Sequence, residues 1–211
     1  NAKEWMWGSE INAEQSTIFA SFFSHMDATF MTYAQLGLQK LIDENLYNRI
    51  ANDDVRKDLW LDTQQSSSLP QYCQMKFLAS SQSEFLGDYL FMRASEMYLI
   101  QAEALANAGN DAAAQQKLEA LISKRQPGYS VALTGQNLLE EIYLQRRIEL
   151  WGEGFRLYDI KRRKKALDRE GHDPALARII ELEPEDYRMV YQIPEDELNN
   201  NDQIGQENQN P

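Results

Sequence analysis

The sequence has one cysteine, two histidines and no long apolar run, and each scarcity excludes a kind of structure. Cys73 has no second cysteine to pair with, which excludes an internal disulfide and a cysteine-based zinc site. His25 and His172 lack the HExxH or paired spacing of metal ligands. No apolar run approaches the roughly 20 residues of a membrane-spanning helix. We therefore expect no metal, no cofactor and no transmembrane helix.

Basic residues are too few to balance the acidic ones. The 33 Asp and Glu against 21 Lys and Arg give a formal charge of −12 at pH 7. Such a surface repels polyanions, so we expect no nucleic-acid partner and no electrostatic attraction to anionic lipid. Hydrophobic residues make up 43% of the 211, an ordinary globular balance for one large domain or two small ones.

Residues 1–88 are predicted to form a variable, loop-rich segment with a short strand and amphipathic helices. Trp5 and Trp7 are two positions apart, so in a strand over residues 3–11 both rings would point to one face. Apolar residues recur at spacings of three and four across residues 15–50, which suits one or two amphipathic helices. The polar stretch at residues 62–72 indicates a loop.

Residues 89–211 show clearer helical periodicity. An apolar stripe that begins near Phe91 predicts a first helix. Gly109 tolerates a left-handed backbone and would end this helix, and Asn110 would cap a second one that ends near Lys124.

Two more helices are expected after a turn at residues 127–128. Asn137, three positions before Glu140, resembles a capping box for a third helix that ends near Trp151. A fourth helix would run from Arg156 to about Leu167.

Two consecutive helical hairpins must stack to bury their apolar faces. The predicted fold class is therefore mostly α, with tetratricopeptide-like helical hairpins, long loops and a few short strands. The Asn- and Gln-rich ending, residues 199–211, would on composition alone be a flexible tail.

Charged residues continue the apolar stripe of the third helix. Arg146, Glu149 and Glu153 follow it by steps of three and four. One hypothesis is a catalytic pair, Glu149 and Glu153, that cleaves a glycan by acid and base chemistry. The other, which we favour, is a structural ion network. Nearby arginines lower the pKa of a carboxyl group, and a carboxyl group that is ionised at neutral pH is a poor general acid. The nearest counter-ions in sequence are Arg147, Arg156 and Asp159.

Aromatic rings are the other candidate site residues, because sugars stack their C–H faces on indole and phenol rings. Tyr33, Trp60 and Tyr72 lie in polar stretches and are the preferred ligand-binding candidates, with Trp7 added to them. Packing in the core is the alternative interpretation for each ring.

Three stretches in the second half carry a resemblance to a known family. Residues 93–104 (RASEMYLIQAEA) look like its RxxExxLxxAEA helix, and residues 145–162 (QRRIELWGEGFRLYDIKR) look like its ERRxELxxEGxRxxDLxR block. Residues 193–211 are similar to its closing IPxxEhxxNxxhxQNP segment, and residues 54–56 match a DxR step more loosely. The chain thus resembles the carboxy-terminal half of the SusD/RagB family of outer-membrane nutrient-binding lipoproteins of Bacteroidetes. Gln145 departs from the Glu that is usual in the family.

The resemblance implies a function and a location. Family members bind extracellular glycans or peptides without catalysis and present them to a SusC-like TonB-dependent transporter. The resemblance implies a place at the outer membrane, exposed at the surface or facing the periplasm. A lipid anchor in an amino-terminal part that precedes this sequence would be the only membrane attachment.

The resemblance also assigns roles to residues. It implies an ordered closing segment and places the charged motif residues in the scaffold, outside the ligand site. These residues are Glu96, Glu103, Arg146, Arg147, Glu149, Glu153, Arg156 and Asp159. A glycan-cleaving enzyme and a helical-repeat adaptor for a protein partner remain as alternatives.

Overall fold

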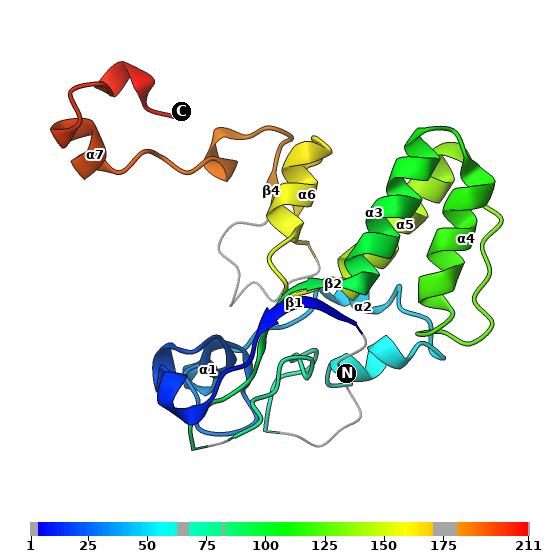
Figure 1. The fold of residues 1–211 in the computed structure, drawn as a ribbon, viewed down its shortest axis with the longest axis horizontal. Coiled ribbons are helices and arrows are strands. Elements are labelled where there is room, and N and C mark those ends of the chain that lie inside the picture. Colours follow the sequence, from blue (N-terminus) through cyan, green and yellow to red (C-terminus); the bar gives the residue numbers. More distant parts are fainter. Residues whose placement is uncertain (1–3, 63–67, 82, 171–180, 211) are drawn as a thin grey trace. The chain divides into compact units, whose positions relative to one another are not determined.

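The structure is a computed structural model that describes residues 4–62, 68–81, 83–170 and 181–210 (Figure 1). It divides into two compact units, Asn1–Leu150 and Trp151–Pro211, a boundary that lies within the predicted segment 89–211. Seven α-helices and two two-stranded sheets make up the regular structure of the described residues, which confirms the mostly-α class. In this part of the chain no helix combines the length and apolar character of a membrane span.

The first predicted hairpin is present with the expected turn. Helix α3 spans Ala94–Asn107 and α4 spans Asp111–Ile122. Gly109 has a φ of 76°, the left-handed conformation that glycine adopts without steric cost. Asn110 caps α4, since its side-chain oxygen accepts a hydrogen bond from the Ala113 N–H at 3.3 Å.

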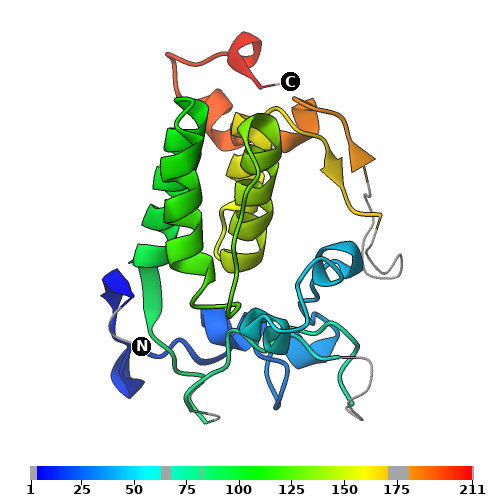
Figure 2. The ribbon, with the colours of Figure 1, turned by 90° about the vertical axis from the view of Figure 1, so that its right-hand side faces the viewer.

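Helix α5, Gly135–Glu149, begins before the capping box predicted at Asn137. Thr134 is the N-cap residue, and the Gly135 N–H donates to Asp111 Oδ2 at 2.9 Å. The cap prediction was wrong because a side chain of the preceding hairpin satisfies this donor, a contact that local sequence does not reveal. Helix α3 packs against both α4 and α5 (Figure 2). The three helices bury apolar side chains that are at most 1% exposed: Leu99, Ala102, Ala114, Leu118, Ile122, Leu138, Ile142 and Ile148.

The helices expected over residues 15–50 are short. They are α1, Phe22–Met26, and α2, Glu44–Tyr47, with single 3₁₀ turns between and before them. Polar side chains accept hydrogen bonds from backbone N–H groups that a longer α1 would pair with its own carbonyls. Asp27 Oδ1 accepts from the Thr29 N–H at 2.8 Å, and Ser24 Oγ accepts from the Tyr33 N–H at 3.1 Å.

The predicted amino-terminal strand is β1, Trp5–Ser9, which pairs antiparallel with β2, Tyr89–Arg93. The register shifts on both sides of Trp7, which breaks the alternation that would place the rings of Trp5 and Trp7 on one face. Trp5 is half-buried, whereas Trp7 is 62% exposed. Gly8 permits the close approach of the two strands, because a Cβ there would lie 2.7 Å from the Tyr89 carbonyl oxygen.

In the second unit, helix α6 spans only Arg156–Arg162, so its predicted end at Leu167 was wrong. Lys164 has a φ of 50°, and the Lys165 N–H donates to the Ile160 carbonyl at 3.0 Å, a left-handed C-terminal cap that ends the helix. Leu167 lies instead in strand β3, Leu167–Asp168, which pairs antiparallel with β4, Glu181–Leu182. Ile160, Leu182 and Met189 form the core of this unit, with Leu157 and Leu167 packed against it.

The closing segment is tied to itself by side-chain amides. It contains helix α7, Glu195–Asn200. Gln209 Oε1 accepts from the Ile193 N–H at 2.8 Å, and Gln209 Nε2 donates to the Ile193 carbonyl at 3.0 Å. Asn210 Nδ2 donates to the Tyr191 carbonyl at 2.8 Å. These contacts agree with an ordered ending and explain why composition alone misdescribes it.

We expect Gly8→Ala to destabilise the first unit by about 1–3 kcal/mol, because the added methyl group overlaps a backbone carbonyl that cannot move without opening the β1–β2 pairing. Urea unfolding followed by circular dichroism measures the change. Ser9→Ala, which adds no atom to the same strand, is the control and should stay within about 0.5 kcal/mol of wild type. Equal stability of the two variants would contradict the steric argument.

Candidate functional site

Glu149, the last residue of α5, lies at the centre of a buried ion cluster with three arginines. Glu149 is 4% exposed. Glu149 Oε1 accepts from Arg93 Nη1 at 2.8 Å and from Arg125 Nη2 at 2.9 Å. Glu149 Oε2 accepts from Arg56 Nη1 and from Arg125 Nε, both at 3.3 Å. We call Glu149, Arg56, Arg93 and Arg125 the Glu149 cluster.

The helix end itself contributes to the Glu149 cluster. The backbone carbonyl of Glu149 accepts from Arg93 Nη2 at 2.6 Å and from Lys76 Nζ at 2.9 Å. The last carbonyls of a helix have no partner within it and carry the negative end of the helix dipole. Cations at this point therefore satisfy a backbone acceptor and offset the dipole at once.

Further acceptors surround the arginines. Arg56 forms a two-pronged ion pair with Asp54, with Nε 3.0 Å from Oδ1 and Nη2 2.6 Å from Oδ2. Arg125 Nη2 lies 2.7 Å from Glu4 Oε1, and Arg93 Nη1 lies 3.4 Å from Glu4 Oε2. Three carboxylates thus face three guanidiniums, which is the pairing that buried charges require.

Gln145, which stands where the motif that this chain resembles has Glu, also belongs to the network. Its Oε1 accepts from Arg56 Nη2 at 2.6 Å, and its Nε2 donates to Glu141 Oε1 at 2.9 Å. The neutral amide therefore retains a strong hydrogen bond to Arg56 without adding a fourth carboxylate to the cluster.

The electrostatics of the cluster oppose acid catalysis by Glu149. Burial by itself raises the pKa of Glu149, but hydrogen bonds from Arg125 and the charges of Arg93, Arg125 and Arg56 outweigh it and lower the pKa to about 2. The carboxylate is therefore ionised at neutral pH, and both of its oxygens accept hydrogen bonds from arginines. Such a group has no proton to give to a leaving sugar. Glu153, the other half of the hypothetical pair, lies in the other compact unit.

The remaining residues of the predicted ion network are distributed over several places. Arg146 Nη2 lies 3.4 Å from Glu96 Oε1, so this pair joins α5 to α3. Arg147 Nη2 lies 4.0 Å from Asp43 Oδ1. In the second unit, Asp159 Oδ1 lies 2.9 Å from Arg162 Nε. Of the others, Glu103 on α3 and Glu153 are half-buried, and Arg156 on α6 is exposed.

The main partners of Glu149 are not the residues nearest to it in sequence. Arg93 opens the motif at residues 93–104, and Arg56 belongs to the loosely matched DxR step, so both had a sequence signal. Arg125 had none, because it follows α4 in a turn without regular spacing. Its role depends on the packing of that turn against the end of α5.

The four candidate ligand rings differ in exposure. Trp60 is 3% exposed, so its ring belongs to the core in this structure and offers no face to a ligand, contrary to its assignment. Tyr33 is 39% exposed, with its ring centroid 4.5 Å from that of His25. Tyr72 is half-buried and its hydroxyl donates to Glu44 Oε1 at 3.2 Å. Trp7 is the most exposed of the four.

The described residues offer little for metal or redox chemistry. No group of three His, Cys, Asp or Glu side chains within them is placed to hold a metal ion. Cys73 is fully buried, and burial raises the pKa of its thiol to about 11, which keeps it protonated and unreactive.

A scan against protein-family models gives one match, to the SusD family, over residues 66–211. This chain belongs to the SusD family. The match includes all three motif stretches that carry the sequence resemblance. Among curated proteins, none matches this chain.

Solved structures support the same assignment. A SusD-like carbohydrate binding protein from Bacteroides vulgatus is 33% identical over 79% of this chain, with a TM-score of 0.66. A SusD superfamily protein from Bacteroides thetaiotaomicron is 28% identical over 81% of the chain, with a TM-score of 0.64. A SusD superfamily protein from Bacteroides fragilis, 24% identical over 95% of the chain with a TM-score of 0.72, shows the shared fold. The chain spans 36%, 40% and 45% of these three proteins, respectively.

We expect Glu149→Gln to destabilise the first unit by about 3–5 kcal/mol, because it removes the central negative charge and leaves three guanidiniums with only two carboxylates, Asp54 and Glu4, to balance them. Urea unfolding measures the loss. Glu185→Gln is the matched control, since the ion pair of Glu185 with Lys164 at 3.0 Å joins side chains that are 63% and 69% exposed. That exposed pair should contribute at most about 1 kcal/mol. A loss at position 149 no larger than the control would show that the cluster is not a stabilising element.

The same carboxylate predicts a pH dependence of stability. Its pKa is about 2 in the folded chain against an ordinary value of 4.5, so its contribution is complete above pH 4.5 and is lost as the pH falls toward 2. The shift corresponds to about 3 kcal/mol. The difference in unfolding free energy between wild type and Glu149→Gln should therefore shrink between about pH 6 and about pH 3. A difference that stays constant over this range would contradict the lowered pKa.

Proposed function

We propose that this chain is part of a protein that binds an extracellular glycan without cleaving it and delivers it to a SusC-like TonB-dependent transporter of the outer membrane. The observation that carries the proposal is membership of the SusD family, together with 33% identity to a SusD-like carbohydrate binding protein over 79% of the chain.

The state of the carboxylates supports binding over cleavage. A glycosidase needs one carboxylic acid that holds a proton near neutral pH and a second carboxylate across the scissile bond. Glu149 is ionised, buried and held by three arginines. The cluster therefore serves as scaffold, and we place recognition elsewhere, on exposed rings.

The exposed rings supply candidate contacts. Tyr33 and Trp7 are exposed, and Tyr72 is a less accessible third candidate. Asp27 and Ser24 hold the backbone of residues 27–33 in place through their hydrogen bonds to Thr29 and Tyr33. A ring on a fixed loop loses little conformational entropy when a sugar stacks on it.

The location is inferred from the family. SusD-like proteins are lipoproteins, which implies that a lipid anchor holds the whole protein at the outer membrane. Cys73 does not serve as the anchor in this proposal, because it is fully buried.

A glycan array followed by a cleavage assay tests the function. The 211-residue chain should bind at least one family of oligosaccharides, and chromatography of the bound oligosaccharide after prolonged incubation should recover it intact. Tyr33→Ala should weaken binding, whereas Tyr158→Ala, at a ring 71% exposed in the second unit, is the control. Release of shorter sugars would support the enzyme instead. Binding of peptides with no glycan bound would favour a peptide-binding member of the family.

A further inference from the structure

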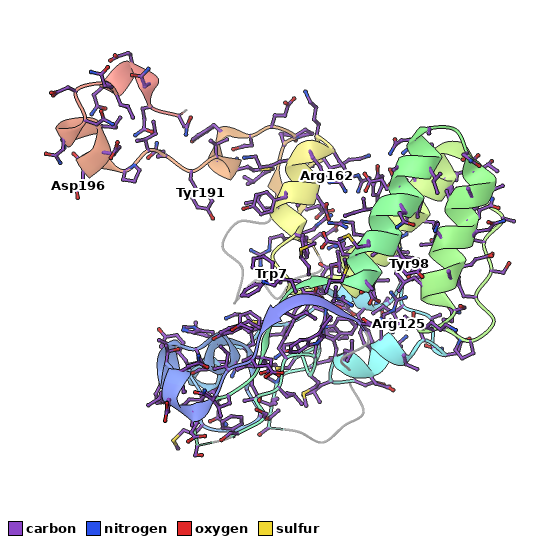
Figure 3. All side chains as sticks on the ribbon, viewed as in Figure 1. Trp7, Tyr98, Arg125, Arg162, Tyr191 and Asp196 are labelled. Carbon is purple, nitrogen blue, oxygen red and sulfur yellow. The ribbon has the colours of Figure 1, made fainter. Side chains whose placement is uncertain are left out.

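The β1–β2 ribbon presents a pair of aromatic rings to solvent. Trp7 of β1 is 62% exposed and Phe91 of β2 is 50% exposed, and their ring centroids lie 5.0 Å apart with planes inclined by 49°. Figure 3 labels Trp7 on the ribbon. Two large rings in contact are ordinarily buried, because burial of each ring removes a large apolar area from water. Their joint exposure on a regular element points to a binding surface.

The ribbon that carries the rings is held in a fixed conformation. The Ala94 N–H at the end of β2 donates to the Glu4 carbonyl at 2.9 Å. Arg93, the last residue of β2, is 8% exposed and belongs to the Glu149 cluster. The rings therefore sit on a backbone that is anchored to the buried ion cluster, and a ligand would not have to order them.

The charges along the ribbon restrict what the rings can bind. The strands Trp5–Ser9 and Tyr89–Arg93 contain one cation, Arg93, whose guanidinium is engaged by Glu149 and Glu4. At the opposite end Ser9 pairs with Tyr89, and the residues that adjoin this pair, Glu10 and Asp88, are both acidic and exposed, with Asp88 Oδ1 accepting from the Ile11 N–H at 3.1 Å. At these two described strands an anionic ligand would meet acidic side chains and no cation other than Arg93, which is already paired.

The other exposed side chains of the ribbon are apolar. Met6 is 55% exposed, and Leu90 and Met92 are each 37% exposed. An apolar surface with paired rings, bordered by hydrogen-bond acceptors, suits the C–H face of a sugar ring whose hydroxyl groups donate to the carboxylates.

We propose that Trp7 and Phe91 form a stacking subsite for neutral sugar residues and that this subsite selects neutral glycans over uronic-acid or sulfated ones. This inference rests on the proposed function, because it specifies where and for which glycan class that binding takes place.

Calorimetric titration with two sets of probes tests the subsite. One set contains neutral gluco-, manno-, galacto- and xylo-oligosaccharides, and the other contains oligogalacturonates of matched length. Wild type should bind at least one neutral probe and bind the oligogalacturonate at least about tenfold more weakly at low salt. Trp7→Ala and Phe91→Ala should each weaken the neutral complex about tenfold or more.

Two further variants separate the subsite from folding. Trp7→Phe keeps an aromatic face and should retain most of the affinity, which a merely structural loss would not predict. Tyr191→Ala, at a ring 85% exposed in the second unit, should bind like wild type. Circular dichroism and thermal unfolding should show that Trp7→Ala stays folded, because its side chain is exposed.

The outcomes distinguish the subsite from the general function. If no probe binds wild type, the proposed function fails and the subsite with it. If a neutral probe binds wild type and Trp7→Ala equally, the function stands and the subsite is wrong. Equal or tighter binding of the oligogalacturonate overturns the selection for neutral sugars. A dimer in light scattering that Trp7→Ala converts to monomer also overturns the subsite, since the rings would then face a second copy of the chain.

Discussion

The ion pairs between Glu149 and three arginines are the interaction on which the first unit depends. They join the end of α5 to residues 56, 93 and 125, and Glu4 adds the amino-terminal strand. These segments lie far apart in the sequence and share no single hairpin. Each charge would cost several kcal/mol to bury alone, so the cluster is stable only when all segments are assembled. The cluster thus couples the helices, the ribbon and the loop before α5 into one cooperative unit.

The cluster also separates the buried charges of the first unit from its exposed aromatic side chains. Carboxylates are common catalytic groups, but the carboxylate of Glu149 is buried and accepts hydrogen bonds from guanidiniums. Exposed aromatic side chains lie on the ribbon, at Trp7 and Phe91, and on the loop after α1, at Tyr33. This arrangement of a buried charged interior and exposed aromatic groups supports the proposed binding function, in which the scaffold and the recognition surface are separate.

Features set by interactions between sequence neighbours were predicted from the sequence, and features set by contacts between distant segments were not. The α3–α4 turn was predicted correctly because Gly109 and Asn110 act on their immediate neighbours. The end of α6 was missed because it depends on a left-handed backbone at Lys164, and lysine is not a residue type that indicates a left-handed conformation. Arg125 was missed because its importance arises only when a turn meets a helix end from another hairpin. The motif resemblance located Glu149 and Arg93, although spacing alone could not pair them.

The side-chain amide of Gln209 forms the two hydrogen bonds that a neighbouring strand would form with Ile193, because it pairs with both the N–H and the carbonyl of that residue. Pro194 follows directly and has no N–H to offer, so this side chain replaces a backbone partner at that point. Asparagine is one methylene shorter and glutamate lacks the donor, so neither reproduces the pairing. One side chain therefore fixes the alignment of the two arms of the closing segment, which elsewhere requires a ladder of backbone hydrogen bonds.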